Sequence, residues 1–216
     1  MSAAASLRVT EIFASIQGES TRAGLPTVFV RLTGCPLRCR WCDTEYAFRG
    51  GTRMSEADIL AAVARHGIPT VCITGGEPLA QPAVLGLMRR LCDMGYCVSI
   101  ETSGALDIAE IDPRVVRVLD LKAPSSGECD KNRLENLLHL RAQDELKFVL
   151  ANETDYRWAC AQIRQHRLAG RCALLFSPVA NQLPAATLAE WIVRDRLPVR
   201  LQLQLHKVLW QDARRR

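Results

Sequence analysis

Residues 27–44 read TVFVRLTGCPLRCRWCDT, an apolar run followed by a loop with closely spaced cysteines. The opening run, residues 27–32, is rich in β-branched and aromatic side chains and predicts a buried β-strand. The cysteines stand in a C-x3-C-x2-C pattern, at Cys35, Cys39 and Cys42. The sequence therefore predicts a group of thiols in one short loop, directly after the end of a strand.

Strand-like runs recur through the chain, at residues 70–74, 96–101, 115–121, 146–150, 172–176 and 199–205. Helical spacing separates most of them, beginning at Ser55 with Asp58 as its capping-box partner and recurring over about 82–94, 132–141, 154–168 and 184–194. This alternation favours an α/β protein with a parallel sheet wrapped by helices. About six units are too few for an eight-unit barrel, so a partial, open (β/α) barrel and a doubly wound sheet both fit.

Polar and glycine-rich segments follow the strand-like runs, at residues 33–35, 75–78, 102–104, 122–126 and 177–178. In either architecture the carboxyl ends of the parallel strands lie at one edge of the sheet, and ligands bind there. The sequence therefore predicts a single binding rim, and the cysteine loop is part of it.

The composition limits the class of protein. The chain has 216 residues, 48% hydrophobic and 24% charged, close to an average globular domain, and we expect one domain. The formal charge is +5, but residues 214–216 supply three of the positive charges, and the remaining +2 does not indicate a nucleic-acid-binding face. Because no apolar run reaches membrane-spanning length and residues 1–8 do not resemble a signal peptide, we expect a cytoplasmic protein.

The cysteine loop admits several kinds of site. A structural zinc site normally has four ligands, and the next candidate ligand, His66, lies in an expected helix. A thioredoxin-like pair of Cys39 and Cys42 would leave Cys35 unexplained. An iron–sulfur cluster fits best, and because purely electron-carrying clusters generally have four cysteine ligands, three imply chemistry at an open iron. The remaining cysteines are expected mostly to be packed as small apolar residues: Cys72, Cys92, Cys97, Cys129, Cys160 and Cys172.

With Trp41 before its last cysteine, the loop resembles the signature of radical S-adenosylmethionine enzymes, whose fold is a partial or complete (β/α) barrel with its cluster at the carboxyl rim. Further motifs resemble the 7-carboxy-7-deazaguanine synthase family: QGES at 17–20, FVRL at 29–32, CDT at 42–44, TGGEP at 74–78, ETSG at 101–104 and LHK at 205–207. The resemblance covers residues 9–209. It implies one radical S-adenosylmethionine domain over residues 1–216, with a substrate-binding segment at about 8–26 and a cluster loop at 34–44.

The resemblance also implies a reaction. Cys35, Cys39 and Cys42 would hold a 4Fe–4S cluster that binds and cleaves S-adenosylmethionine. The resulting radical would start the ring contraction of 6-carboxy-5,6,7,8-tetrahydropterin to 7-carboxy-7-deazaguanine, with loss of ammonia, on the route to queuosine. Thr44 would bind Mg²⁺, which prefers oxygen ligands. The family further implies a homodimer and an electron donor such as a flavodoxin or ferredoxin, and we expect no direct contact with nucleic acid.

Individual site residues follow from the matched motifs. Arg31 is the expected counterion of the substrate carboxylate, with other substrate contacts from Ile16, Gln17, Gly18 and Thr102. The expected cofactor contacts are Trp41, Cys42, Asp43, Gly75, Gly76, Glu77, Gly104, Asp120, Leu121, Lys122, Ser177 and Pro178. Further candidates are Glu19, Gln204 and His206, and no catalytic side chain is assigned beyond the cofactor and metal ligands. The chain departs from many relatives at Ser20, where they have glycine, and in the tail after Lys207.

Two other functions are compatible with the cysteine loop. One is an activating enzyme that installs a glycyl radical on a protein partner, which would not need the CDT motif or the Arg31 and Thr102 pair. The other is a non-catalytic iron–sulfur or zinc-binding module. The identity of the bound metal and the nature of the substrate distinguish the three.

Overall fold

The computed structural model describes residues 6–211, which form one mixed sheet with the strand order β3-β1-β2-β4-β5-β6-β7-β8-β9. The strands are β1 (Ser6–Ile16), β2 (Pro26–Leu32), β3 (Thr52–Ser55), β4 (Thr70–Gly75), β5 (Cys97–Thr102), β6 (Val116–Asp120), β7 (Glu145–Leu150), β8 (Ala173–Pro178) and β9 (Arg200–Leu201). The α-helices are α1 (Glu56–Ala64), α2 (Val84–Asp93), α3 (Glu153–Gln165), α4 (Ala185–Arg194) and α5 (Leu205–Trp210). Short 3₁₀ turns are η1 (Glu45–Ala47), η2 (Pro78–Ala80), η3 (Pro124–Ser126), η4 (Cys129–Lys131) and η5 (Leu134–His139).

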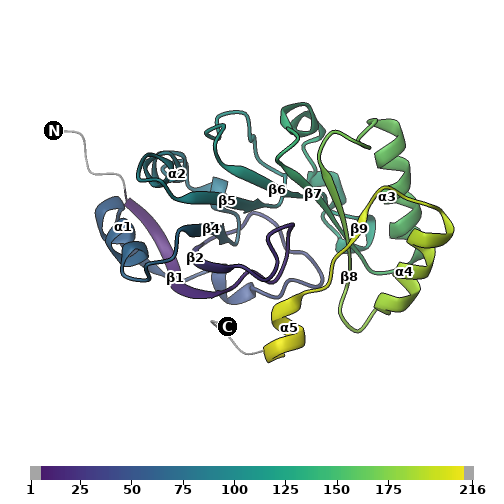
Figure 1. The fold of residues 1–216 in the computed structure, drawn as a ribbon, viewed down its shortest axis with the longest axis horizontal. Coiled ribbons are helices and arrows are strands. Elements are labelled where there is room, and N and C mark those ends of the chain that lie inside the picture. Colours follow the sequence, from purple (N-terminus) through teal and green to yellow (C-terminus); the bar gives the residue numbers. More distant parts are fainter. Residues whose placement is uncertain (1–5, 212–216) are drawn as a thin grey trace.

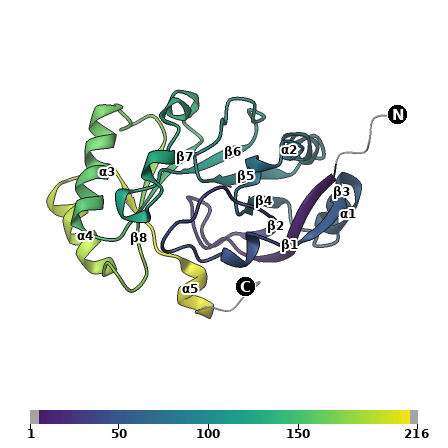
Figure 2. The ribbon, with the colours of Figure 1, turned by 180° about the vertical axis from the view of Figure 1, so that it is seen from behind.

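The sheet is parallel from β2 to β9 and does not close, because β3 and β9 form its two edges. Figures 1 and 2 show α1 to α4 around the outside of the curved sheet, with α5 at its β8 and β9 end. This open arrangement confirms the predicted partial (β/α) barrel.

The core explains why the predicted strands form. Ile73 of β4 lies opposite Ile100 of β5, and both side chains are fully buried. Phe148 and Phe176 make an edge-to-face contact between β7 and β8, with ring centroids 5.5 Å apart. Strands that are covered on both faces read as continuous apolar runs, which is the pattern seen in the sequence.

Helices α1 and α3 begin at capping residues, Ser55 and Asn152. The Ser55 hydroxyl accepts a hydrogen bond from the backbone N–H of Asp58 at 3.1 Å, which confirms the predicted cap of α1. Helix α2 buries Val84, Leu87 and Leu91 on one face, as its apolar spacing predicts.

Four elements differ from the prediction. The expected helix at 132–141 is the short turn η5, because the Asn136 side chain donates to the backbone carbonyls of Gly104 and Leu106 and ties the segment to the rim. The expected strand at 199–205 is limited to β9. Strands β1 and β3 were not predicted; they pair antiparallel at the start of the sheet and carry the segment that leads into residues 17–25.

All nine cysteines are free thiols. Of the six outside the cluster loop, Cys72 and Cys160 are buried, so apolar packing holds for them. The prediction is wrong for Cys97, which is exposed at the start of β5, and the other three are half-buried.

Candidate active site

A cavity of about 740 Å³ lies at the carboxyl ends of the parallel strands. Segments far apart in the sequence contribute to its wall, from the β1–β2 connection to α5. The predicted site residues among its lining are Ile16, Gln17, Gly18, Glu19, Arg31, Cys35, Cys39, Trp41, Cys42, Asp43, Thr44, Gly75, Gly76, Thr102, Asp120, Lys122, Ser177, Pro178, Gln204 and His206. The structure therefore brings most of the candidates from the sequence to one place.

Glu77 is a predicted cofactor contact that does not line the cavity. Its carboxylate is fully buried and accepts hydrogen bonds from the Thr102 hydroxyl at 2.9 Å, the Ser103 backbone N–H at 2.7 Å and the Leu79 backbone N–H at 3.0 Å. A buried carboxylate with this many donors holds the ends of two strands together. Its position therefore points to support of the rim.

Gly104 and Leu121 also lie beneath the cavity wall. Gly104 has a φ of +75°, and a side chain there would approach Leu119 Cδ1 to 3.1 Å. Its carbonyl accepts a hydrogen bond from the Arg133 N–H at 3.1 Å. Leu121 is fully buried in the core. Both positions shape the backbone on which the lining residues stand.

The cysteine loop is fixed by backbone contacts on two sides. The Gly34 N–H donates to the Ala47 carbonyl at 2.8 Å, and the Glu77 N–H donates to the Gly34 carbonyl at 2.7 Å. A Cβ on Gly76 would lie 2.1 Å from the Gly34 oxygen, so only glycine allows the β4 rim this close to the loop. The Arg40 N–H donates to the Ser126 carbonyl at 3.0 Å on the other side.

Cys35, Cys39 and Cys42 are half-buried, free and face the same cavity. Burial raises the pKa of the Cys35 and Cys39 thiols, while the ammonium of Lys122 acts in the opposite direction on Cys39. Among residues 6–211, no group of three or more His, Cys, Asp and Glu side chains lies close enough to hold a single metal ion. A 4Fe–4S cluster distributes its thiolate ligands over several irons, and a loop of three soft donors on a large cavity fits that group.

The side chain of Arg31 is held in place by two neighbouring residues, Glu11 and Tyr46. Its Nε donates to a carboxylate oxygen of Glu11 at 2.9 Å, and the Tyr46 hydroxyl donates to the same oxygen at 2.9 Å. The Arg31 guanidinium carbon also lies 5.9 Å from the centroid of the Tyr46 ring. These contacts fix one edge of the guanidinium, whose five N–H donors leave others for an anion in the cavity. Sequence reasoning did not identify Glu11 or Tyr46.

The hydrogen bonds of Thr102 at the rim bear on its predicted contact with the substrate. Thr102 lines the cavity, but its hydroxyl donates to Glu77, so with that bond in place it could only accept a hydrogen bond from a substrate. On the neighbouring strand, the Thr74 hydroxyl donates to Glu101 at 3.0 Å, and Gln17 Nε2 lies 3.4 Å from the other oxygen of Glu101. Glu101 is therefore a cavity carboxylate that the site prediction omitted. An acidic residue near the end of a buried strand was the available signal.

Ile16, Gln17 and Gly18 enter the cavity from the β1–β2 connection. The Gln17 backbone N–H donates to the Leu25 carbonyl and its carbonyl accepts from the Gly24 N–H, both at 2.8 Å. The backbone N–H and carbonyl of Gln17 are thus both used within the β1–β2 connection. Its side-chain amide is directed to Glu101.

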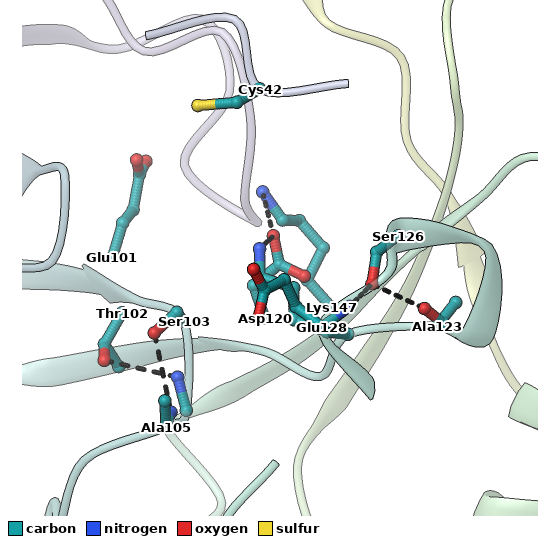
Figure 3. Close-up of polar contacts among 12 residues, drawn as sticks. Cys42, Glu101, Thr102, Ser103, Ala105, Asp120, Ala123, Ser126, Glu128 and Lys147 are labelled. Carbon is teal, nitrogen blue, oxygen red and sulfur yellow. Dashed lines mark hydrogen bonds and ion pairs between the residues drawn. The ribbon is translucent and has the colours of Figure 1, made fainter. Parts of the chain in front are cut away.

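Four alternating charges cross the floor of the cavity. Lys147 Nζ lies 2.7 Å from a Glu19 oxygen and 3.5 Å from Asp120 Oδ2, and Lys122 Nζ lies 3.0 Å from the same Asp120 oxygen. Figure 3 shows Asp120 and Lys147 together below Cys42, with Glu101 pointing into the same space. Burial acts to raise the pKa of Glu19, but the Lys147 ammonium, the hydrogen bond from Gln204 and the charge of His206 together outweigh it and lower the pKa to about 2. Sequence reasoning missed Lys147, although a lysine inside the apolar run of β7 was the available signal.

The C-terminal segment closes the cavity next to Gly18. The Leu205 N–H donates to the Gly18 carbonyl at 2.9 Å. A Cβ on Gly18 would lie 2.1 Å from His206 Nδ1, so the glycine makes room for the imidazole. His206 therefore reaches the cavity without disturbing the β1–β2 connection.

Gln202 and Gln204 also bind the C-terminal segment to the β1–β2 connection. Gln204 Nε2 donates to Glu19 at 2.7 Å, and Gln202 Oε1 accepts from the Ser20 N–H at 2.9 Å. Ser20 has a φ of +69°, which is the left-handed conformation that glycine adopts more readily. The extended arginine-rich tail, residues 212–216, lies outside the described residues.

Thr44 lies beside the cluster loop. Its hydroxyl oxygen is 3.8 Å from Cys42 Sγ, and it lines the cavity together with Asp43. The Asp43 carboxylate lies 3.3 Å from Gln204 Nε2 and 3.7 Å from Lys207 Nζ. The two oxygen-bearing side chains thus stand between the cysteine loop and the C-terminal segment.

The fold and the cysteine loop define a radical S-adenosylmethionine enzyme. The model of the radical SAM superfamily matches residues 29–120. The structure of SuiB from Streptococcus suis bound to S-adenosylmethionine has the same fold, with a TM-score of 0.55 and 13% identity over 79% of this chain and 44% of that one.

Full-length relatives identify the family within this class of enzymes. A 7-carboxy-7-deazaguanine synthase of Chlorobaculum tepidum is 49% identical and covers 99% of both chains, and one of Koribacter versatilis is 45% identical over 94% of this chain and 97% of the relative. The crystal structure of QueE from Escherichia coli has a TM-score of 0.78 and 25% identity over 93% of this chain and 95% of that one. The chain belongs to the 7-carboxy-7-deazaguanine synthase family.

Membership of this family implies a 4Fe–4S cluster and S-adenosylmethionine as cofactors. The full-length match argues against the two other functions considered from the sequence, a glycyl-radical activating enzyme and a non-catalytic metal module. Within residues 6–211, none of the helices is long and apolar enough to cross a membrane.

Proposed function

We propose that this chain converts 6-carboxy-5,6,7,8-tetrahydropterin to 7-carboxy-7-deazaguanine by a radical ring contraction with loss of ammonia. One observation carries the proposal: a single cavity contains the three thiols of the cysteine loop and, on β2, an oriented arginine. The thiols suit a radical-generating cluster, and the arginine suits a substrate with a carboxylate. The relatives' names give the product, 7-carboxy-7-deazaguanine, for a protein nearly half identical to this chain.

Cys35, Cys39 and Cys42 would hold the 4Fe–4S cluster in this reaction. When bound, the cluster and S-adenosylmethionine supply the radical that removes hydrogen from the substrate. Trp41 is half-buried beside the loop and would keep water from the metal. The cofactor contacts proposed from the lining are Trp41, Cys42, Asp43, Gly75, Gly76, Asp120, Lys122, Ser177 and Pro178, with Glu77, Gly104 and Leu121 supporting them from beneath.

The substrate would lie between Arg31 and the β1–β2 connection. Arg31 would pair with the substrate carboxylate while Glu11 keeps its Nε occupied. Gln17, with Ile16 and Gly18 beside it, would bind the polar edge of the pterin ring. Glu19, Thr102, Gln204 and His206 would complete this end of the cavity.

Mg²⁺ is proposed at Thr44. A hydroxyl oxygen, the substrate carboxylate and water are hard ligands of the kind that Mg²⁺ prefers. Thr44 lines the cavity next to Cys42, which would place the ion beside the cysteine loop that would hold the cluster.

The remaining properties of the enzyme are proposals of the same kind. We expect residues 1–216 to act as one domain, with a flavodoxin or ferredoxin as the electron donor. Free cysteines throughout the chain support a reducing, cytoplasmic compartment. Exposed apolar side chains around α5, at Leu203, Val208 and Leu209, support a homodimer, which light scattering of the reconstituted protein would test.

The decisive experiment is an anaerobic assay of reconstituted protein with S-adenosylmethionine, dithionite, Mg²⁺ and 6-carboxytetrahydropterin, followed by mass spectrometry. We expect 7-carboxy-7-deazaguanine from the native chain and none from Cys39→Ala, which removes one cluster ligand. Cleavage of the cofactor without conversion of the pterin would contradict the proposed substrate. Retention of the 4Fe–4S absorbance in Cys39→Ala would contradict the ligand assignment.

A further inference from the structure

Lys147 occupies a position that the proposed reaction does not use. It projects from β7 between the β1–β2 connection, which carries Glu19, and the end of β6, which carries Asp120. Its side chain is only 12% exposed, and those of Glu19 and Asp120 are 14% and 15% exposed. Ion pairs shielded to this degree couple more strongly than surface pairs, and loss of one member leaves an uncompensated charge.

The two sides of Lys147 belong to different parts of the site. Glu19 belongs to the segment proposed to bind the pterin and is also held by Gln204 from the C-terminal segment. Asp120 belongs to the rim proposed to bind the cofactor, and it pairs with Lys122, whose charge acts on Cys39. Lys147 therefore forms ion pairs with residues of both halves of the cavity.

Asp120 carries an open hydrogen-bonding position. Its Oδ2 faces Lys147 and Lys122, whereas its Oδ1 is buried and accepts no hydrogen bond within the described part of the chain. Buried acceptors are normally satisfied, so an unpaired carboxylate oxygen beside a cavity fits a donor on a bound ligand. A hydroxyl or ammonium group of the cofactor is a donor of that kind.

We propose that Lys147 is a positioning residue that couples the binding of S-adenosylmethionine to the binding of the pterin. A donor bound to Asp120 Oδ1 neutralises part of the carboxylate's negative charge and so weakens the attraction between Asp120 and Lys147. Lys147 then pairs more strongly with Glu19. Glu19 in turn fixes residues 17–20 against the C-terminal segment, where the pterin binds. Each ligand therefore strengthens the binding of the other, as linkage requires. This inference rests on the proposed function.

The test measures equilibrium binding without reductant, so that no turnover occurs. In anaerobic, cluster-reconstituted protein, the dissociation constant of S-adenosylmethionine is determined by calorimetry with and without saturating 6-carboxytetrahydropterin. We expect the pterin to tighten cofactor binding about fivefold or more in the native chain. Lys147→Met should bring this ratio close to one, and Lys147→Arg, which keeps the charge, should restore it. Lys131→Met, which removes an exposed ion pair with Asp130, is the matched control and should leave the ratio unchanged.

The outcomes separate the inference from the proposed function. A native chain that binds no pterin contradicts the proposed function. A native chain that binds both ligands without coupling, or a Lys147→Met variant with the native ratio, overturns the role of Lys147. If Lys147→Met does not retain its cluster, Glu19→Gln provides the same comparison from the other end of the ion pair. Loss of coupling in Glu19→Gln supports the inference, and a native ratio there overturns it.

Discussion

At the scale of single residues, the site depends on side chains that orient other side chains. Arg31 stands on β2, where its neighbours in the sequence are buried and apolar, and Glu11 pairs with it from the adjacent strand β1. A partly buried guanidinium needs such a partner, because burial of an unpaired charge is costly. The same contact determines which N–H groups remain for a ligand.

Replacement of Glu11 should therefore affect substrate binding specifically. In Glu11→Gln the ion pair with Arg31 becomes a hydrogen bond from the guanidinium to a neutral amide, and we expect the KM for the pterin to rise about tenfold with little change in kcat, a loss of about 1.4 kcal/mol. Steady-state kinetics would measure this, with the cluster absorbance as a check on folding. Tyr46→Phe, which removes only the second donor to Glu11, should have a smaller effect. An unchanged KM in Glu11→Gln would show that Arg31 needs no orientation.

Thr44 gives a second prediction at this scale. Thr44→Ala removes the hydroxyl oxygen proposed to bind Mg²⁺ but leaves the three cysteines in place. We expect the variant to retain its cluster and reductive cofactor cleavage, while the Mg²⁺ concentration for half-maximal turnover rises by about tenfold. A titration of product formation against Mg²⁺ would test this. Native activity with an unchanged magnesium response would refute the assignment.

At the scale of elements, the regular parts of the fold could be predicted and the irregular parts could not. A short apolar run such as 70–74 predicts a buried strand, because a parallel strand that is covered on both faces has apolar side chains along its whole length. Segment 132–141 has helical spacing, yet Asn136 bonds to the backbone of the β5 rim and fixes a 3₁₀ turn. Such a bond depends on a partner about 30 residues away, which local periodicity does not report.

The site was predictable to the extent that its residues follow strand ends or sit in a recognised motif. The cysteine loop met both conditions, and Arg31, which stands within β2, met the second through the FVRL motif. Glu101 and Lys147 stand inside strands, where a charged residue reads as an exception to an apolar pattern. Their significance comes from cross-strand neighbours, Thr74 for one and Asp120 for the other, and these pairings require the sheet topology.

The close contact between the end of β4 and the cysteine loop predicts the effect of a side chain at Gly76. A methyl group on Gly76 would collide with the Gly34 carbonyl and displace the start of the loop. We expect Gly76→Ala to lower stability by about 1–3 kcal/mol and to reduce the iron content after reconstitution. Gly86→Ala in α2 is the control, because the nearest atom to its new methyl group is 3.7 Å away and alanine favours a helix. Urea unfolding and iron analysis would compare the two, and equal iron content would contradict the prediction.

At the scale of the whole molecule, the charges on the cavity floor link stability to pH. Glu19 has a pKa of about 2 in the folded chain and 4.5 ordinarily, so its stabilising effect is complete above pH 4.5 and is lost as the pH falls toward 2. The effect is on the order of 3 kcal/mol.

Comparison of the native chain with Glu19→Gln isolates this contribution. We expect the native chain, measured before cluster reconstitution, to be more stable than the variant at pH 7, with most of the difference gone near pH 2.5. Urea unfolding at the two pH values would measure it. A difference that does not depend on pH would show that Glu19 acts through packing instead of charge.

The attachment of residues 202–207 to residues 17–20 also bears on biosynthesis. The hydrogen bonds to the backbone of the cysteine loop come from residues up to 128, so they are available before residues 202–207 have been made. Leu205, Gln204 and Gln202, which bind Gly18, Glu19 and Ser20, are made well after these residues. A nascent chain can therefore form the metal-binding loop before residues 202–207 exist, whereas the substrate end of the cavity is completed only after they have been made.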